Sequence, residues 1–96
     1  MYYCISRISF EPNDTGKDPM KDLKSLVVKL RARFTACVKV DQMATRKSAP
    51  TLVIAQLNAH QSSLQNQMDQ IIDFCEDSGF GRVESEEAIM DILDFS

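Results

Sequence analysis

The sequence has no tryptophan, one histidine and three widely spaced cysteines. The small number of histidines and cysteines argues against a disulfide framework and against a metal site. Cys4, Cys37 and Cys75 lie 33 and 38 residues apart. An odd count at such spacing fits neither a disulfide framework nor a CxxC metal knuckle. We therefore expect each thiol to be a small buried hydrophobe. His60 has no second histidine or nearby cysteine, so we expect it at the surface of a helix entry and expect no metal site.

Long apolar runs are also missing. No stretch approaches the roughly 20 residues that span a bilayer, and residues 1–12 lack the basic start and apolar core of a signal peptide. We therefore expect a cytoplasmic protein without membrane contact. The 96 residues, 44% hydrophobic and 26% charged, predict one globular domain over residues 1–96. They leave no room for a cofactor domain, and we expect no cofactor.

Charge is unevenly distributed along the chain. Residues 17–47 carry nine of the eleven basic side chains and three carboxylates, which gives 9 − 3 = +6. Residues 48–96 carry nine carboxylates and one arginine, which gives 1 − 9 = −8. The formal net charge of −3 therefore hides a dipolar chain, whose basic part can meet phosphates or the acidic part of another copy.

The first half of the chain predicts strand, helix and strand. Tyr2–Phe10 is rich in aromatic and β-branched residues, as strands are. Asp18 followed by Pro19 is a typical helix start. The helix then runs to about Phe34, because Leu23, Leu26, Val27, Leu30 and Phe34 recur at helical spacing. Residues 36–41 alternate as in a half-buried strand, and Gln42–Pro50 is expected to be an irregular basic loop.

The second half predicts a strand, a helix and one ambiguous segment. Thr51–Leu57 is apolar on both faces, which suits a central strand. A helix is expected from about Ala59 to Asp77, ended by Gly79. Residues 85–95 fit a strand or a helix about equally well.

This order predicts an α+β fold. A βαββαβ chain with right-handed crossovers closes into a ferredoxin-like sandwich, an antiparallel sheet with two helices on one face. Strands 1 and 3 are then central, and the two-sided apolarity of Thr51–Leu57 fits that place. The other sheet face is left without helices, so Val53, Ala55 and Leu57 are predicted to lie in a homodimer interface.

Four segments carry a family resemblance. Met20–Lys24, Val27–Phe34, Val38–Asp41 and Leu52–Asn58 match, in order, the helix start, the helix with its closing phenylalanine, and the second and third strands of the YlxP-like family. The chain thus resembles these small bacterial proteins of unassigned biochemical role. The resemblance implies a ferredoxin-like fold, and with it a strand for residues 85–95. The family often has a Trp-Gln pair where this chain has Met43–Lys47.

Two functional hypotheses follow. YlxP-like genes often neighbour genes of translation initiation and ribosome maturation, so the resemblance implies a role linked to RNA or the ribosome. The basic helix and the 42–50 loop would then present cations to phosphates, namely Lys21, Lys24, Lys29, Arg31, Arg33, Arg46 and Lys47. The alternative is a self-associating structural or protein-interaction module that dimerises through its sheet.

An enzyme is not expected. Acylphosphatases share this size and element order, but they need a phosphate cradle with an arginine after the first strand. Glu11–Lys17 holds one glycine, two carboxylates and no arginine. Glu86 and Glu87 are adjacent and would point apart in a strand, so they do not form an acid–base pair.

Overall fold

The computed structural model describes residues 1–12, 18–47 and 49–95. Residues 13–17, most of the loop expected after the first strand, lie outside the described residues, as does residue 48. Four strands form one antiparallel sheet in the order β2-β3-β1-β4: β1 (Tyr2–Phe10), β2 (Cys37–Val40), β3 (Thr51–Asn58) and β4 (Val83–Ile92). The predicted fold class and the central position of strands 1 and 3 are confirmed.

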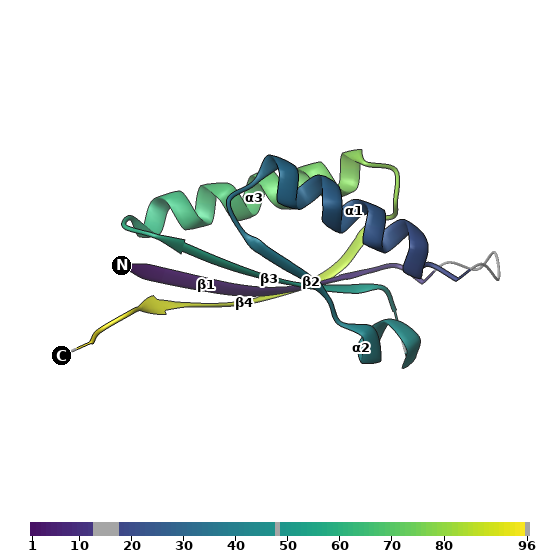
Figure 1. The fold of residues 1–96 in the computed structure, drawn as a ribbon, viewed down its shortest axis with the longest axis horizontal. Helices are drawn as coiled ribbons and strands as arrows, with labels where there is room; N and C mark the ends of the chain where they lie inside the picture. Colours follow the sequence, from purple (N-terminus) through teal and green to yellow (C-terminus); the bar gives the residue numbers. More distant parts are fainter. Residues whose placement is uncertain (13–17, 48, 96) are drawn as a thin grey trace.

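Two long helices cover the same side of the sheet (Figure 1). They are α1 (Met20–Arg33) and α3 (Gln61–Asp77). The apolar stripe predicted for α1 is buried, with Leu23 and Leu30 both fully enclosed. Together with the inward residues of β1, β2 and β3, the helices enclose one hydrophobic core.

The helix ends follow local sequence signals. Asp18 Oδ1 accepts a hydrogen bond from the backbone N–H of Met20 at 2.9 Å, which satisfies one of the free donors at the start of α1. At the end of α3, Gly79 has φ +78°, a conformation that a residue with a side chain rarely adopts. The turn that follows directs Phe80 onto Phe10, with ring centroids 4.9 Å apart.

The expected irregular loop at 42–50 is wrong for its first part. Gln42–Lys47 forms a short helix, α2, which lies near the end of β2 on the side of the sheet away from α1 (Figure 1). Asp41 starts it, because its carboxylate accepts from the N–H of Ala44 at 3.1 Å and its carbonyl accepts from Thr45 Oγ1 at 2.7 Å. Thr45 Oγ1 in turn accepts from the N–H of Thr51 at 3.1 Å, which fixes α2 to the start of β3.

Candidate functional site: the open face of the sheet

Alternation along β1 separates a covered face from an open one. Cys4, Ser6 and Ile8 are buried toward the helices, and Ser6 Oγ donates to the sulfur of Met68 in α3 at 3.0 Å. The intervening Ile5 and Arg7 are exposed. Successive side chains of a strand point to opposite faces, so Ile5 and Arg7 lie on the face away from α1 and α3. We call this surface the open face. Contrary to expectation, it is not wholly without helices, because α2 lies on the same side of the sheet near the end of β2 (Figure 1).

The cross-strand register extends the open face over the whole sheet. One row of directly paired residues contains Cys37, Ala55, Ile5 and Ile89, from β2 through to β4. The next row on the same face contains Lys39, Val53, Arg7 and Glu87. A third row, on the other side of the first row and on the same face, contains Leu57, Tyr3 and Asp91.

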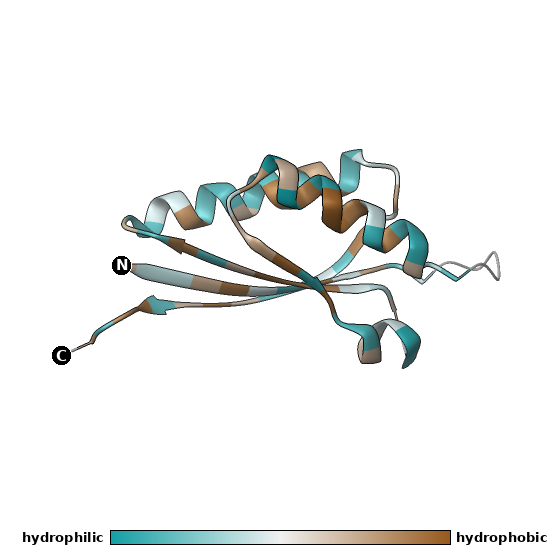
Figure 2. Cartoon of the chain, viewed as in Figure 1, coloured by the Kyte–Doolittle hydropathy of each residue, from teal (hydrophilic) through white to brown (hydrophobic). Residues whose placement is uncertain are grey.

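The centre of the open face is apolar and unusually exposed. Ile5 is 44% exposed, Leu57 61% and Ile89 65%. A wide, open trough runs over the β2, β3 and β1 part of the first row and over the Leu57 end of the sheet. Its lining includes Tyr3, Ile5, Cys37, Ala55 and Leu57. Figure 2 shows hydrophobic stretches, in brown, along β2 and β3. Val53, Ala55 and Leu57, predicted as interface residues, all lie on this face. A contiguous exposed apolar patch commonly marks an interaction site.

Charges of both signs border the apolar centre. Lys39 stands at the β2 end of its row and Glu87 at the β4 end. Between them Arg7 approaches Asp41 with 3.9 Å between Nη2 and Oδ2. The open face is thus an apolar surface that carries Lys39, Arg7 and the Asp41 carboxylate toward β2 and the carboxylates of Glu87 and Asp91 on β4.

The seven residues predicted to bind RNA lie at several places in the structure. Lys21 and Lys24 are exposed on α1, whereas Arg46 and Lys47 lie on α2. Arg46 lines a hollow together with Asp18, Pro19 and Met20 at the start of α1. Arg33 lies over the ring of Phe74, with its Cζ 5.3 Å from the ring centroid. Arg46 thus lies near the start of α1, whereas Arg33, at the end of α1, packs on Phe74 of α3.

Arg31 has a structural role. Its Nε and Nη2 donate to the carbonyl of Val38 at 3.0 and 2.6 Å, so the guanidinium attaches α1 to the edge strand β2. Lys24 and Lys39 line the same shallow hollow as Arg31, together with the exposed Val28. The structure therefore gathers three cations at the β2 edge, one of which, Lys39, the sequence analysis did not select.

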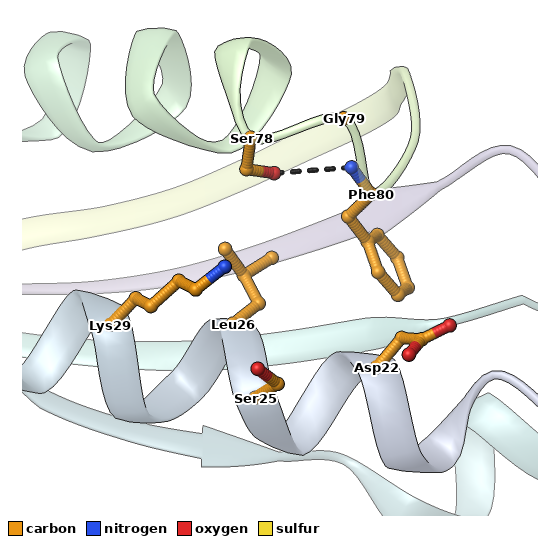
Figure 3. A pocket seen from close by; sticks show the side chains of 7 residues that line it. All are labelled: Asp22, Ser25, Leu26, Lys29, Ser78, Gly79 and Phe80. Carbon is orange, nitrogen blue, oxygen red and sulfur yellow. Dashed lines mark hydrogen bonds between the residues drawn. The ribbon is translucent and has the colours of Figure 1, made fainter.

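Lys29 lies in a small hollow between α1 and the end of α3 (Figure 3). Asp22, Ser25 and Leu26 line it from α1, and Ser78, Gly79 and Phe80 line it from the turn. Ser78 Oγ accepts from the N–H of Phe80 at 3.2 Å. The carboxylate and the carbonyl end of α3 make this hollow unfavourable for a phosphate. Both favour a cation such as the Lys29 ammonium, and α3 has no basic residue of its own in its last turn.

The cysteines are only partly where they were expected. Cys4 and Cys75 are buried, but Cys37 is exposed, because in β2 it is Val38 that points to the core. Burial and, to a lesser extent, the nearby Glu76 raise the pKa of the Cys75 thiol to about 12. His60 is exposed at the start of α3, as predicted. Among the described residues no three acidic, histidine or cysteine side chains are placed to hold a metal ion.

Sequence reasoning missed half of the open face. It identified the β3 residues, because apolar side chains on both faces of one strand are a clear signal. It did not select Tyr3, Ile5, Cys37 or Ile89, since these join the patch only through the cross-strand register. The signal available in the sequence was that Tyr3 and Ile5, at alternate positions of β1, are apolar although the residue between them faces the core.

Comparisons with known proteins bear on the fold. No protein-family model and no curated protein matches the chain. In the part of the chain that the structure describes, no helix has the length and apolar character needed to cross a membrane. Among solved structures, the chain is similar to a dimeric ferredoxin-like protein of unknown function from Thermobifida fusca, with a TM-score of 0.52 and 14% identity over 96% of this chain and 92% of that chain. That likeness and the observed topology together give this chain a ferredoxin-like α+β fold.

Proposed function

We propose that this protein is a non-catalytic interaction module that associates with a second copy of itself through the open face. The observation that carries the proposal is the exposure of Ile5, Leu57 and Ile89 on one continuous face of the sheet. Covering such a surface removes apolar area from water, which favours association. The structural neighbour from Thermobifida fusca is described as dimeric, which is consistent with this proposal.

The size of the open face fits a reversible dimer. Three strands of eight paired positions and the four positions of β2, at about 4.8 Å between strands and about 3.4 Å per residue, cover about 450 Å² per copy. Two copies would bury about 900 Å², which is in the range of weak, transient interfaces. We therefore expect a dimer that dissociates on dilution.

A non-catalytic role is supported by two of the three cysteines, Cys4 and Cys75, which are buried, whereas Cys37 is exposed. A reactive cysteine needs a lowered thiol pKa, whereas the pKa of Cys75 is raised to about 12. Cys4 is buried, and His60 lies at the exposed start of α3. Membership of the YlxP-like family stays a prediction from the sequence.

The test compares matched charge insertions. Leu57 on the open face and Val28 on α1 are almost equally exposed, at 61% and 64%. Leu57→Glu would place a charge in the apolar centre of the dimer and is expected to give a monomer by sedimentation equilibrium. Val28→Glu is expected to keep the parent's mass, and circular dichroism checks that both variants are folded. A parent that stays monomeric at every concentration, or equal effects of the two variants, would rule the proposal out.

Contact with RNA is the second candidate, favoured by one observation. Lys24, Arg31 and Lys39 surround one shallow hollow at the β2 edge. If these three cations meet phosphates of single-stranded RNA, the logarithm of the binding constant should fall with the logarithm of salt concentration at a slope of about −2. Binding to total ribosomal RNA at two salt concentrations, with Lys24→Glu beside the parent, measures that slope. Absence of binding at low salt would reject this candidate.

A further inference from the structure

The two outer strands of the sheet carry opposite charge. β2 is the short edge strand, and its exposed Lys39 lies beside Arg31 and Lys24. β4 is the long edge strand and carries four exposed carboxylates: Glu84, Glu86, Glu87 and Asp91. On the open face itself the charged row begins with Lys39 on β2 and ends with Glu87 on β4. The face is therefore electrostatically complementary to its own rotated copy.

We infer that the second copy packs on the open face with the two-fold axis parallel to the strands, so that the basic edge of each copy lies over the acidic edge of the other. This inference rests on the proposed dimer and adds its geometry. In a two-fold pair of stacked sheets the axis can run along the strands or across them. An axis along the strands sets β2 over the partner's β4, whereas an axis across them sets β4 over β4 and β2 over β2. The second arrangement opposes like charges at both edges, which is unfavourable.

Register then predicts which residues meet. Stacked sheets lie about 10 Å apart with their strands nearly aligned. Lys39 then faces the partner's Glu87, and the symmetry repeats this pair on the other side. Cys37 faces the partner's Ile89, and Ala55 faces the partner's Ile5. Arg7 faces the partner's Val53 and keeps Asp41 of its own chain as a counter-charge at 3.9 Å.

Opposite edges could instead join side by side, which would give an open filament. Two features of β2 oppose this arrangement. The strand is only four residues long, and the carbonyl of Val38 already accepts two hydrogen bonds from Arg31. A strand with few free backbone groups is a poor template for another strand. Stacking uses both edges of each copy at once and closes the assembly at two chains.

Charge reversal tests this geometry. Lys39→Glu replaces two attractions by two repulsions, so the dimer dissociation constant, measured by sedimentation equilibrium at low salt, should rise by about tenfold or more. Glu87→Lys should do the same. The double variant Lys39→Glu/Glu87→Lys should return to within about threefold of the parent. Lys21→Glu, the same change at an exposed site on α1, should leave the constant unchanged.

Cross-linking gives an independent test of register. Cys37 is exposed while Cys4 and Cys75 are buried, so thiol reagents are directed to Cys37. In Ile89→Cys a short bis-maleimide should join Cys37 to the new thiol of the partner and give a covalent dimer. Within one chain, β2 and β4 are three strand spacings, about 14 Å, apart, which a short linker does not bridge. Ser85→Cys, on the same face of β4 but four residues away, should give little covalent dimer.

The outcomes separate the two proposals. A dimer that Leu57→Glu dissociates but that neither charge reversal weakens keeps the proposed function and overturns this orientation. Equal cross-linking of Ile89→Cys and Ser85→Cys also overturns it. Chains longer than two, growing with concentration, would overturn the closed arrangement in favour of edge pairing. A monomeric parent would overturn both proposals.

Discussion

Thr45→Val tests whether α2 is a fixed part of the fold. The hydroxyl of Thr45 donates to the Asp41 carbonyl at 2.7 Å and accepts the N–H of Thr51 at 3.1 Å. Valine keeps the shape but removes both bonds. The Asp41 carbonyl still accepts from the N–H of Thr45 at 3.0 Å, so the loss falls on the buried N–H of Thr51. Leaving a buried donor without an acceptor costs about 1–3 kcal/mol.

We therefore expect Thr45→Val to lower the free energy of unfolding by about 2 kcal/mol, equivalent to about 10 °C in Tm for a domain of this size. Urea unfolding followed by circular dichroism at fixed protein concentration measures it. Thr45→Ser keeps the hydroxyl and should recover most of the loss. Thr35→Val, the same change at an exposed site, should stay within about 0.5 kcal/mol of the parent. A Thr45→Val variant as stable as the Thr35→Val control would refute the assigned role of α2.

Three further predictions concern the core and the thiols. Leu30 is fully buried, so Leu30→Ala should cost about 3 kcal/mol in urea unfolding and Leu30→Asp should abolish the cooperative transition; a parent-like melt of the aspartate variant would show that α1 packs differently. Ellman's reagent should titrate one thiol per native chain, Cys37, at a rate that falls as protein concentration rises, and three thiols in denaturant; two fast thiols in the native protein would contradict the burial of Cys4 and Cys75. Because the pKa of Cys75 rises from 9.0 unfolded to about 12 folded, its contribution to stability is complete below pH 9 and is lost between pH 9 and 12. Urea midpoints at pH 8 and 10.5 should therefore fall less steeply in Cys75→Ala than in the parent, and equal slopes would contradict the raised pKa.

How far the sequence predicts this fold depends on how each element is packed. β1, α1 and β3 touch the core on a regular set of positions, so their periodicity reveals them. β4 was ambiguous because it lies at the sheet edge with Glu86, Ala88 and other side chains exposed on both faces, so burial imposes no alternation on it. The six residues of α2 are too few for a helical period, and its start signal, Asp41, also fits the end of a strand.

The candidate site was predictable only in part for a related reason. Charge counted along residues 17–47 suggests one basic surface, but a helix distributes consecutive residues around its axis. Arg31 and Arg33 also have partners within the fold, the Val38 carbonyl and the Phe74 ring. Apolar residues of the open face, by contrast, come from four strands, and only the pairing register brings Ile5 and Ile89 together.

The position of β4 has a consequence for how this sequence can change over generations. Among the described residues, every fully buried hydrophobic side chain lies at or before Cys75, and β4 supplies none. Natural selection for a stable core therefore acts weakly on residues 84–92. Their carboxylates and apolar residues such as Ile89 can therefore change freely unless contact with another molecule constrains them. If relatives of this chain keep an acidic residue at position 87 together with a basic residue at position 39, this joint conservation would indicate that the two positions are held by a contact with another molecule.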